Sequence, residues 1–191
     1  MIRPLLAGAA CLALLSACNQ NGASPAVDKA QDMAAAPVGQ VSAATMGSNM
    51  VSAFVPNAAM SDMYEIQAAD IALQKSGDAS IKALARMIKT DHTAASNKFR
   101  GLIPAAAPDV TLPTALDQRR QGLIDNLRSA SAADFDKVWL DQQIAAHQEG
   151  VTLMSGFKDN TDAPTLAAFA AEVLPKIQAH LDQANKLKAA M

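Results

Sequence analysis

The chain has 191 residues, and its 16 lysines and arginines against 18 aspartates and glutamates give a formal net charge of −2. Half of the residues are hydrophobic, and only 4% are aromatic. The composition, with no basic run and few aromatic side chains for base stacking, argues against a nucleic-acid-binding surface, and we expect no nucleic-acid partner.

Residues 1–17 have the pattern of a signal peptide: Arg3, an apolar stretch over residues 5–15, and the sequence Leu-Ser-Ala-Cys ending at Cys18. The apolar stretch is shorter than the about 20 residues that a membrane-spanning helix needs. The Leu-Ser-Ala-Cys box resembles that of bacterial lipoproteins. This resemblance implies a lipid on Cys18, an anchor in the outer membrane and a protein on its periplasmic face. The alternative is an ordinary secretory signal that leaves a soluble periplasmic protein.

The remaining chain divides into a tether and one domain. Residues 18–57 are rich in Ala, Gly, Ser, Asn and Pro without sustained periodicity, and we expect a lipid-anchored disordered tether there. Residues 58–191 are long enough for one ordinary domain. The only cysteines, Cys11 and Cys18, lie in or beside the signal. Catalysis by a cysteine nucleophile is therefore excluded for the domain.

Every periodic segment of the domain has helical spacing, which predicts an all-α fold. Asp78 is the expected cap of the second helix, Pro104 its expected stop, and Pro175 an expected kink in the last helix. Four long helices with a longer middle connection predict a ferritin-like four-helix bundle, with an additional short helix in the crossing connection. The expected helices cover residues 58–76, 78–103, 114–129, 132–158 and about 164–191.

The three histidines of the chain lie on three different long helices. His92, His147 and His180 each replace an apolar residue within a core stripe. A buried imidazole without a partner costs about 1–3 kcal/mol, so these side chains need one another, carboxylates, water or a metal ion as partners. Glu65 on the first helix is the obvious acidic candidate. Further carboxylates near these stripes are Asp91, Glu149 and Glu172.

The levels of these side chains in the bundle follow from counting residues from the corners at about 1.5 Å each. Glu65 and His92 fall at a similar level. His147 and His180 differ by roughly 8 Å, more than one turn. The count therefore favours Glu65 with His92 as a pair over His147 with His180.

The spacing also bears on the kind of metal site. Di-iron bundles use Glu-x-x-His, but the residues three positions before the histidines are Lys89, Ile144 and Ile177. We therefore expect no ferritin-type di-iron centre. A mononuclear site of Glu65 and the three histidines would suit one divalent ion of zinc, copper, nickel or iron.

Several motifs together resemble the bacterial family known as domain of unknown function 4142. The likeness spans about residues 54–187 and implies a ferritin-like helical bundle exported to the envelope, without an established activity. Trp139 stands where the family often has tyrosine. The positions carried over are Glu65, Asp91, His92, His147 and His180. The matching stretches are residues 65–73, Lys89 to His92, Leu112-Pro113, Phe135-Asp136 with Trp139, His147, Leu174-Pro175 and His180-Leu181.

We therefore expect a periplasm-facing, lipid-anchored helical bundle that binds a divalent metal through core histidine and glutamate side chains. No catalytic residue is identifiable, so a binding role is favoured over an enzymatic one. One alternative is a structural or stress-related envelope module with purely architectural histidines. A weaker alternative is a redox enzyme on a degenerate di-iron-like site.

Overall fold

The computed structural model describes residues 49–191. The expected signal peptide, Cys18 and most of the expected tether lie outside these residues. The described part contains five helices and no strand, which confirms the all-α expectation. None of these helices has both the length and the apolar character needed to cross a membrane. The helices are α2 (Val51–Lys75), α3 (Ala79–Ala106), α4 (Gln118–Ser129), α5 (Phe135–Phe157) and α6 (Pro164–Ala189).

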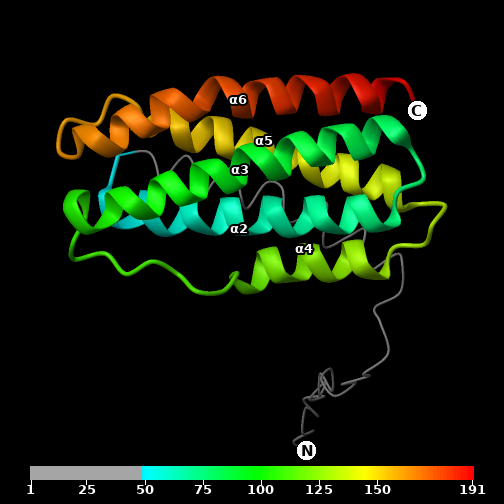
Figure 1. Ribbon diagram of the computed structural model, residues 1–191, viewed down its shortest axis with the longest axis horizontal. Coiled ribbons are helices and arrows are strands. Elements are labelled where there is room, and N and C mark those ends of the chain that lie inside the picture. The colour runs from blue at the N-terminus through cyan, green and yellow to red at the C-terminus, as the bar shows by residue number, and fades with distance from the viewer. Residues whose placement is uncertain (1–48) are drawn as a thin grey trace, which may run out of the picture.

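The four long helices lie side by side along the long axis of the molecule (Figure 1). Helices α2 and α6 each pack against both α3 and α5, so the four enclose a common interior. The short helix α4 lies outside this group, against α2 and α5, within the connection from α3 to α5. Each long helix thus offers one face to the same interior.

Helix α2 begins at Val51, earlier than the expected start at residue 58. The reason is tertiary packing: Phe54 and Val55 are fully buried. The ring of Phe54 stacks on Phe157 at the end of α5, with the ring centroids 3.8 Å apart. The expected boundary between tether and domain therefore falls several residues too late.

The ends of α3 show one confirmed prediction and one error. Asp78 caps the helix, its carboxylate accepting from the backbone N–H groups of Ser80 and Ile81. Pro104 does not stop it, because α3 continues to Ala106. So close to the C-terminus, a proline removes one backbone hydrogen bond without interrupting a long run of them.

The two following helices begin a few residues later than expected. Helix α4 starts at Gln118, because the Asp117 carboxylate accepts from the backbone N–H of Arg120 at 2.7 Å. Helix α5 starts at Phe135, with the backbone N–H of Asp134 donating to Ser131 Oγ at 3.2 Å. The helix types were predicted correctly. The start of α4 is set by its capping side chain, whereas α5 follows a turn closed by Ser131 and has no side-chain cap.

Lys75 joins the end of α2 to the end of α4. Its Nζ donates to the carbonyls of Leu127, Arg128 and Ala130 at 3.0, 2.7 and 2.8 Å. These carbonyls lie at the C-terminal end of α4, where a cation is also favoured by the helix dipole. One side chain therefore satisfies three acceptors and attaches the short helix to the long ones.

The apolar interior is divided into two clusters, one toward each end of the long helices. One contains Phe54, Phe99 and Phe157, and the other contains Tyr64 and Trp139. Between them, all four long helices place buried polar side chains at the same level. This polar layer consists of Asp62, Glu65, His92, Ser96, Gln143, His147 and His180.

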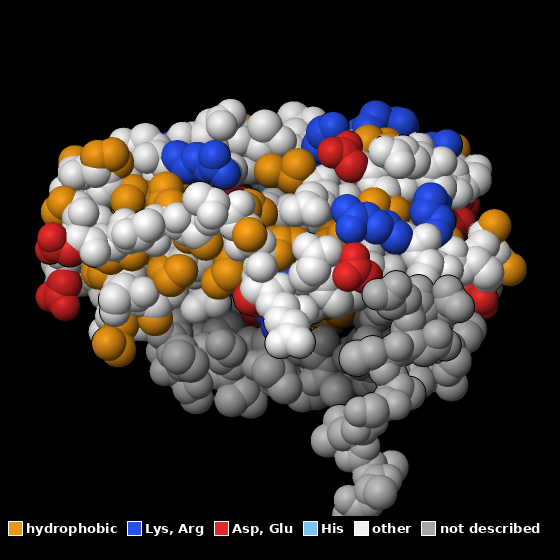
Figure 2. Space-filling model, turned by 90° about the horizontal axis from the view of Figure 1, so that it is seen from below, with side chains coloured by type: hydrophobic (Ala, Val, Ile, Leu, Met, Phe, Trp, Pro, Cys, Tyr) orange, Lys and Arg blue, Asp and Glu red, His pale blue; other side chains and the backbone are white. Residues whose placement is uncertain are grey.

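One outer face of the molecule is visible in Figure 2. Hydrophobic side chains gather toward the end of this face along which the connection between α3 and α4 runs, and most lysine and arginine side chains lie toward the other end. Acidic side chains lie close to several of the basic ones. This visible surface therefore carries charges of both signs.

Candidate metal centre

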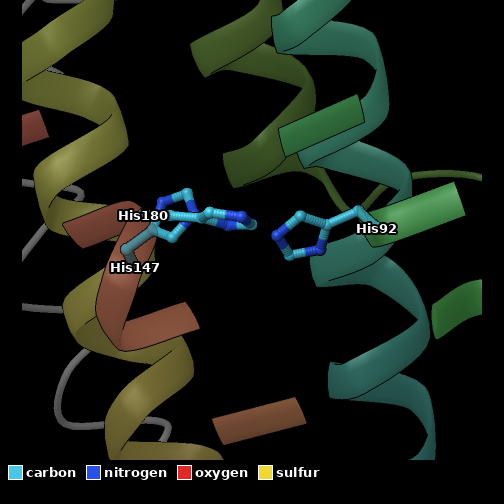
Figure 3. A group of neighbouring side chains, drawn as sticks. All are labelled: His92, His147 and His180. Atoms are coloured by element: carbon cyan, nitrogen blue, oxygen red, sulfur yellow. The ribbon is translucent and has the colours of Figure 1, made fainter. Parts of the chain in front are cut away.

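The three histidines meet in the middle of the polar layer. His92 comes from α3, His147 from α5 and His180 from α6, and their rings point into a common space (Figure 3). The ring centroids are 5.3 to 5.7 Å apart, and one nitrogen from each ring lies within 4.8 Å of the other two. All three side chains are buried. The sequence prediction that they face one core is confirmed.

His147 is oriented by its own helix. Its Nδ1 lies 2.9 Å from the carbonyl oxygen of Gln143, one turn earlier on α5. A carbonyl oxygen can only accept, so Nδ1 carries the proton and donates it. Nε2 of the neutral ring is therefore left with a free lone pair.

His180 is oriented by the neighbouring helix. Its Nε2 donates to Oδ2 of Asp91 on α3 at 3.0 Å. The remaining nitrogen, Nδ1, lies 3.3 Å from Nε2 of His147. With both opposite nitrogens donating to oxygens, two unprotonated nitrogens face each other in the neutral pair.

His92 completes the arrangement from the other side of the cluster. Its Nδ1 donates to Oδ1 of Asp62 on α2 at 2.8 Å. Its Nε2 is buried and has no hydrogen-bond partner. A polar atom buried without a partner costs about 1–3 kcal/mol, so this nitrogen needs an explanation.

The three rings share one pattern. Each is hydrogen-bonded through one nitrogen to an oxygen outside the cluster, while the other nitrogen faces the cluster. Metal-binding histidines are usually held in this way, because the outer hydrogen bond sets the tautomer and the ring orientation. The converging nitrogens are Nε2 of His92, Nε2 of His147 and Nδ1 of His180, a donor set that fits zinc, copper, nickel or iron.

The protonation of the rings follows from their surroundings. Burial, together with the charges of His92 and His180, holds the pKa of His147 well below its ordinary value. Burial also lowers the pKa of His180, despite its hydrogen bond to Asp91. For His92, burial acts in the same direction, but the hydrogen bond and charge of Asp62 outweigh it and raise the pKa. His92 is thus the ring most inclined to hold a proton, which a metal ion would replace.

Glu65 lies at the edge of the cluster. Its Oε1 is 3.5 Å from Nδ1 of His147, and its Oε2 is buried without a hydrogen-bond partner. Burial raises the pKa of this carboxyl to about 7, although the charge of His92 acts against the rise. Its direct contact is therefore with His147, and the predicted preference for a Glu65–His92 pair is wrong.

The predicted separation of His147 from His180 is also wrong, because these rings are in contact. The residue count placed the corner midway between the helix ends. In the structure, the connection from Phe157 to Pro164 carries the chain outward beyond the end of α5 before α6 begins (Figure 1). Extended residues advance about 3.3 Å each, so even a short loop shifts the register by a helical turn.

The other predicted carboxylates have different positions. Asp91 accepts from His180 and also pairs with Lys176, and these contacts lower its pKa although burial raises it. Glu149 accepts from Arg119 at 2.9 Å and from Arg120 at 2.8 Å, outside the cluster.

Glu172 is exposed and forms an ion pair with Lys98. The structure thus places Asp91 beside the cluster as a hydrogen-bond acceptor, and holds Glu149 and Glu172 in ion pairs elsewhere.

Asp62 is the important residue that the sequence reading missed. It is buried and orients His92. Its spacing in the sequence could have identified it, because Asp62 lies three positions before Glu65 and therefore on the same face of α2. With the helix expected to begin at residue 58, Asp62 fell near its N-terminus, where acidic residues are common for other reasons.

Fold and site together define an all-helical protein with a buried cluster of three histidines. Residues 36–187 match the family model described as Domain of unknown function (DUF4142). The chain therefore belongs to this family, as its motifs predict. A search of curated proteins gave no significant match.

Among solved structures, the chain is similar to one described as CopM in the Cu(II)-bound form. The TM-score is 0.63 at 22% sequence identity, and the match covers 73% of this chain and 95% of that chain. At this identity the likeness shows a shared helical fold.

Proposed function

We propose that this protein binds one divalent transition-metal ion, with copper as the first candidate, through Nε2 of His92, Nε2 of His147 and Nδ1 of His180. The observation that carries the proposal is the pattern of hydrogen bonds. One nitrogen of each ring is hydrogen-bonded to an oxygen, and one nitrogen from each ring lies within 4.8 Å of the other two. Imidazoles held in this way are preorganised for a cation.

The charges around the cluster support a divalent ion. Asp62 and Asp91 each accept a hydrogen bond from a ring of the cluster. Their carboxylates would offset positive charge on the ion without binding it directly, Asp62 more than Asp91, which also pairs with Lys176. Glu65, whose pKa of about 7 lets it exist in either form near neutrality, is the remaining acidic group beside the rings.

Two arguments place copper ahead of zinc, nickel and iron. Sites of nitrogen donors bind divalent copper more tightly than the other divalent ions of the first transition row. The structural neighbour is described in a Cu(II)-bound form, and this likeness supports copper as the ion to test first. The donor set itself also accepts the other three metals.

The experiment is metal analysis of the full chain, purified without a histidine tag and reconstituted with copper(II), zinc or nickel. We expect one ion per chain and an increase in the melting temperature, because an ion that binds only the folded state stabilises it. His92→Ala, His147→Ala and His180→Ala should each abolish stoichiometric binding. Ser96→Ala changes a buried polar residue one turn from His92 and should bind normally. No stoichiometric metal, with an unchanged melting temperature, would contradict the proposal.

The architectural alternative rests on the contact between His147 and His180. Their facing nitrogens, 3.3 Å apart, would form a hydrogen bond if one of them carried a proton. That arrangement leaves Nε2 of His92 and Oε2 of Glu65 without partners, whereas a metal ion would use the first of them. The orphaned nitrogen therefore favours the metal site.

We also propose that the fold is of the ferritin-like four-helix type, with α4 in the crossing connection. The packing of α2 and α6 against both α3 and α5 supports this layout. The chain lacks Glu-x-x-His before any histidine, so we do not propose the iron chemistry of that class. An iron(II) oxidation assay tests the redox alternative, and catalytic oxidation of iron(II) by the reconstituted protein would support that alternative.

For the location, we propose a lipid anchor on Cys18 that holds the protein on the periplasmic face of the outer membrane, with the residues between Cys18 and the start of α2 at Val51 as a tether. The Leu-Ser-Ala-Cys sequence supports this. Cys18→Ser should move the protein from the membrane fraction to the soluble fraction. A wild-type protein that is already soluble would instead support the ordinary secretory signal.

A further inference from the structure

A pocket opens between α3 and α6 and reaches the histidine cluster. Its cavity volume is about 120 Å³, enough for several water molecules. His92 and His180 line it, together with Asp62 and Asp91. Because the side chains of both histidines are almost fully buried, they belong to the inner part of this pocket.

The outer part of the pocket carries two ion pairs. Lys98 pairs with Glu172, and Lys176 pairs with Asp91 at 3.2 Å. Both lysine side chains are about half exposed. The pocket therefore runs from charged groups in contact with solvent to two of the three rings.

The carboxylates at the inner end of the pocket, which could otherwise bind a metal ion, already accept hydrogen bonds. Asp62 accepts from His92, and Asp91 accepts from His180. Glu65 is absent from the pocket lining and contacts His147, which does not line the pocket either. Among the described residues that line the pocket, the two carboxylates nearest the rings are therefore already held by hydrogen bonds, and Met154 offers a thioether, which is a weak acceptor.

We infer that a metal ion bound by the three histidines keeps one coordination position open toward this pocket, and that this position takes a small Lewis base from solvent. The inference rests on the proposed metal binding. Metal sites with three protein ligands commonly leave the fourth position to an exogenous ligand. The small cavity and its apolar residues Ala95, Val173 and Ile177 limit that ligand to a few heavy atoms.

Azide is a suitable probe, because it binds copper(II) through one nitrogen and produces an azide-to-copper charge-transfer band. The full chain loaded with copper(II) is titrated with azide and followed by absorption and by electron paramagnetic resonance. We expect a saturable band and an altered copper spectrum, with copper still bound.

Two leucine variants of α3 test the pocket itself. Ala95→Leu fills the pocket, and we expect it to raise the azide dissociation constant by about tenfold or more, with the copper spectrum before azide unchanged. Ala83→Leu is the matched control, because Ala83 is exposed on the same helix and does not line the pocket. Ala95→Val, a smaller change with a smaller expected effect, replaces Ala95→Leu if that variant fails to fold.

The outcomes separate the two proposals. Copper that binds but shows no response to azide overturns the open position, and equal azide affinity in the wild type and Ala95→Leu overturns access through the pocket. Loss of copper on adding azide also counts against the inference. A chain that binds no copper overturns the proposed function and this inference with it.

Discussion

Nε2 of His147 lies 3.3 Å from Nδ1 of His180, and each ring donates its opposite N–H to an oxygen. Two unprotonated nitrogens at this distance repel each other unless a proton or a cation lies nearby. The third ring, His92, adds an orphaned nitrogen to the same space. The cluster is thus arranged to bind a cation, and substitutions of the surrounding residues can test whether it does.

Asp62, whose carboxylate accepts the hydrogen bond from Nδ1 of His92, should matter for metal affinity although it would not bind the ion directly. Asp62→Ala removes the acceptor of the Nδ1 proton, which holds the ring in place. Loss of such a partner typically lowers metal affinity by about 10- to 100-fold. Isothermal titration with copper(II) in a weakly chelating buffer measures the change.

Asp70→Ala is the matched control, because Asp70 lies on the same helix but pairs with Lys89 at the surface. Its affinity should equal that of the wild type. If Asp62→Ala binds as tightly as Asp70→Ala, His92 is not held by Asp62 in the metal-bound protein.

The close approach of α5 and α6 should also be needed for the site. A side chain at Gly150 would place its Cβ 3.3 Å from Cγ2 of Ile177, one turn from each of the two contacting histidines. Gly150→Leu should therefore push the helices apart, cost about 1–3 kcal/mol of stability and weaken metal binding. Urea unfolding and metal titration measure the two effects.

Gly101→Leu on α3 is the control, since nothing lies within 4 Å of its Cβ position. Because glycine is a poor helix former, this variant should be neutral or slightly stabilising. A Gly150→Leu protein with wild-type stability and affinity would show that the spacing of α5 and α6 is not critical.

Lys75 should contribute to stability without touching the metal site. Lys75→Met leaves three carbonyls at the end of α4 without their donor, so we expect a loss of about 1–3 kcal/mol in the free energy of unfolding. Lys82→Met on α3 should change stability by less than about 0.5 kcal/mol. Equal values for the two variants would mean that water replaces Lys75 at these carbonyls.

The acid side of the stability curve should depend on Asp117. Burial raises the pKa of this carboxyl. The hydrogen bond from the Arg120 backbone and the charge of Arg120 lower the pKa by more than burial raises it, so in the folded protein it lies below its ordinary value of 3.8. A depressed folded pKa gives stability that is present above the unfolded pKa and lost as the pH falls through the folded pKa.

Asp117→Asn keeps a good capping side chain but removes the charge. We expect it to cost about 0.5–1 kcal/mol at neutral pH, a small value because solvent screens a partly exposed group. The difference from the wild type should vanish as the pH falls below the lowered folded pKa of Asp117, measured by urea unfolding with a chelator present. A difference independent of pH would assign the effect to the cap alone.

Much of this architecture can be predicted from local patterns. The apolar stripes indicate the helices, and each histidine is conspicuous because it interrupts such a stripe. Asp78 was identifiable because a cap depends on residues close in sequence. The start of α2 could not be identified in this way, because Phe54 is held there by Phe157, about a hundred positions away in the chain.

The details of the site depend on geometry that residue spacing does not contain. The contact between His147 and His180 depends on how far the loop before Pro164 extends along the molecule. The role of Asp62 depends on where α2 begins and on which side chain α3 presents to it. A sequence can therefore indicate that three histidines share a core, but their hydrogen-bond partners require the packed structure.

The most direct test is anomalous X-ray diffraction from crystals of the copper-loaded protein, recorded at the copper absorption edge. We predict one strong anomalous peak per chain, at about 2 Å from Nε2 of His92, Nε2 of His147 and Nδ1 of His180. The hydrogen bonds of the rings to Asp62, Gln143 and Asp91 should be retained. Anomalous peaks only at surface side chains, with the three rings still in mutual contact and no metal between them, would contradict the account.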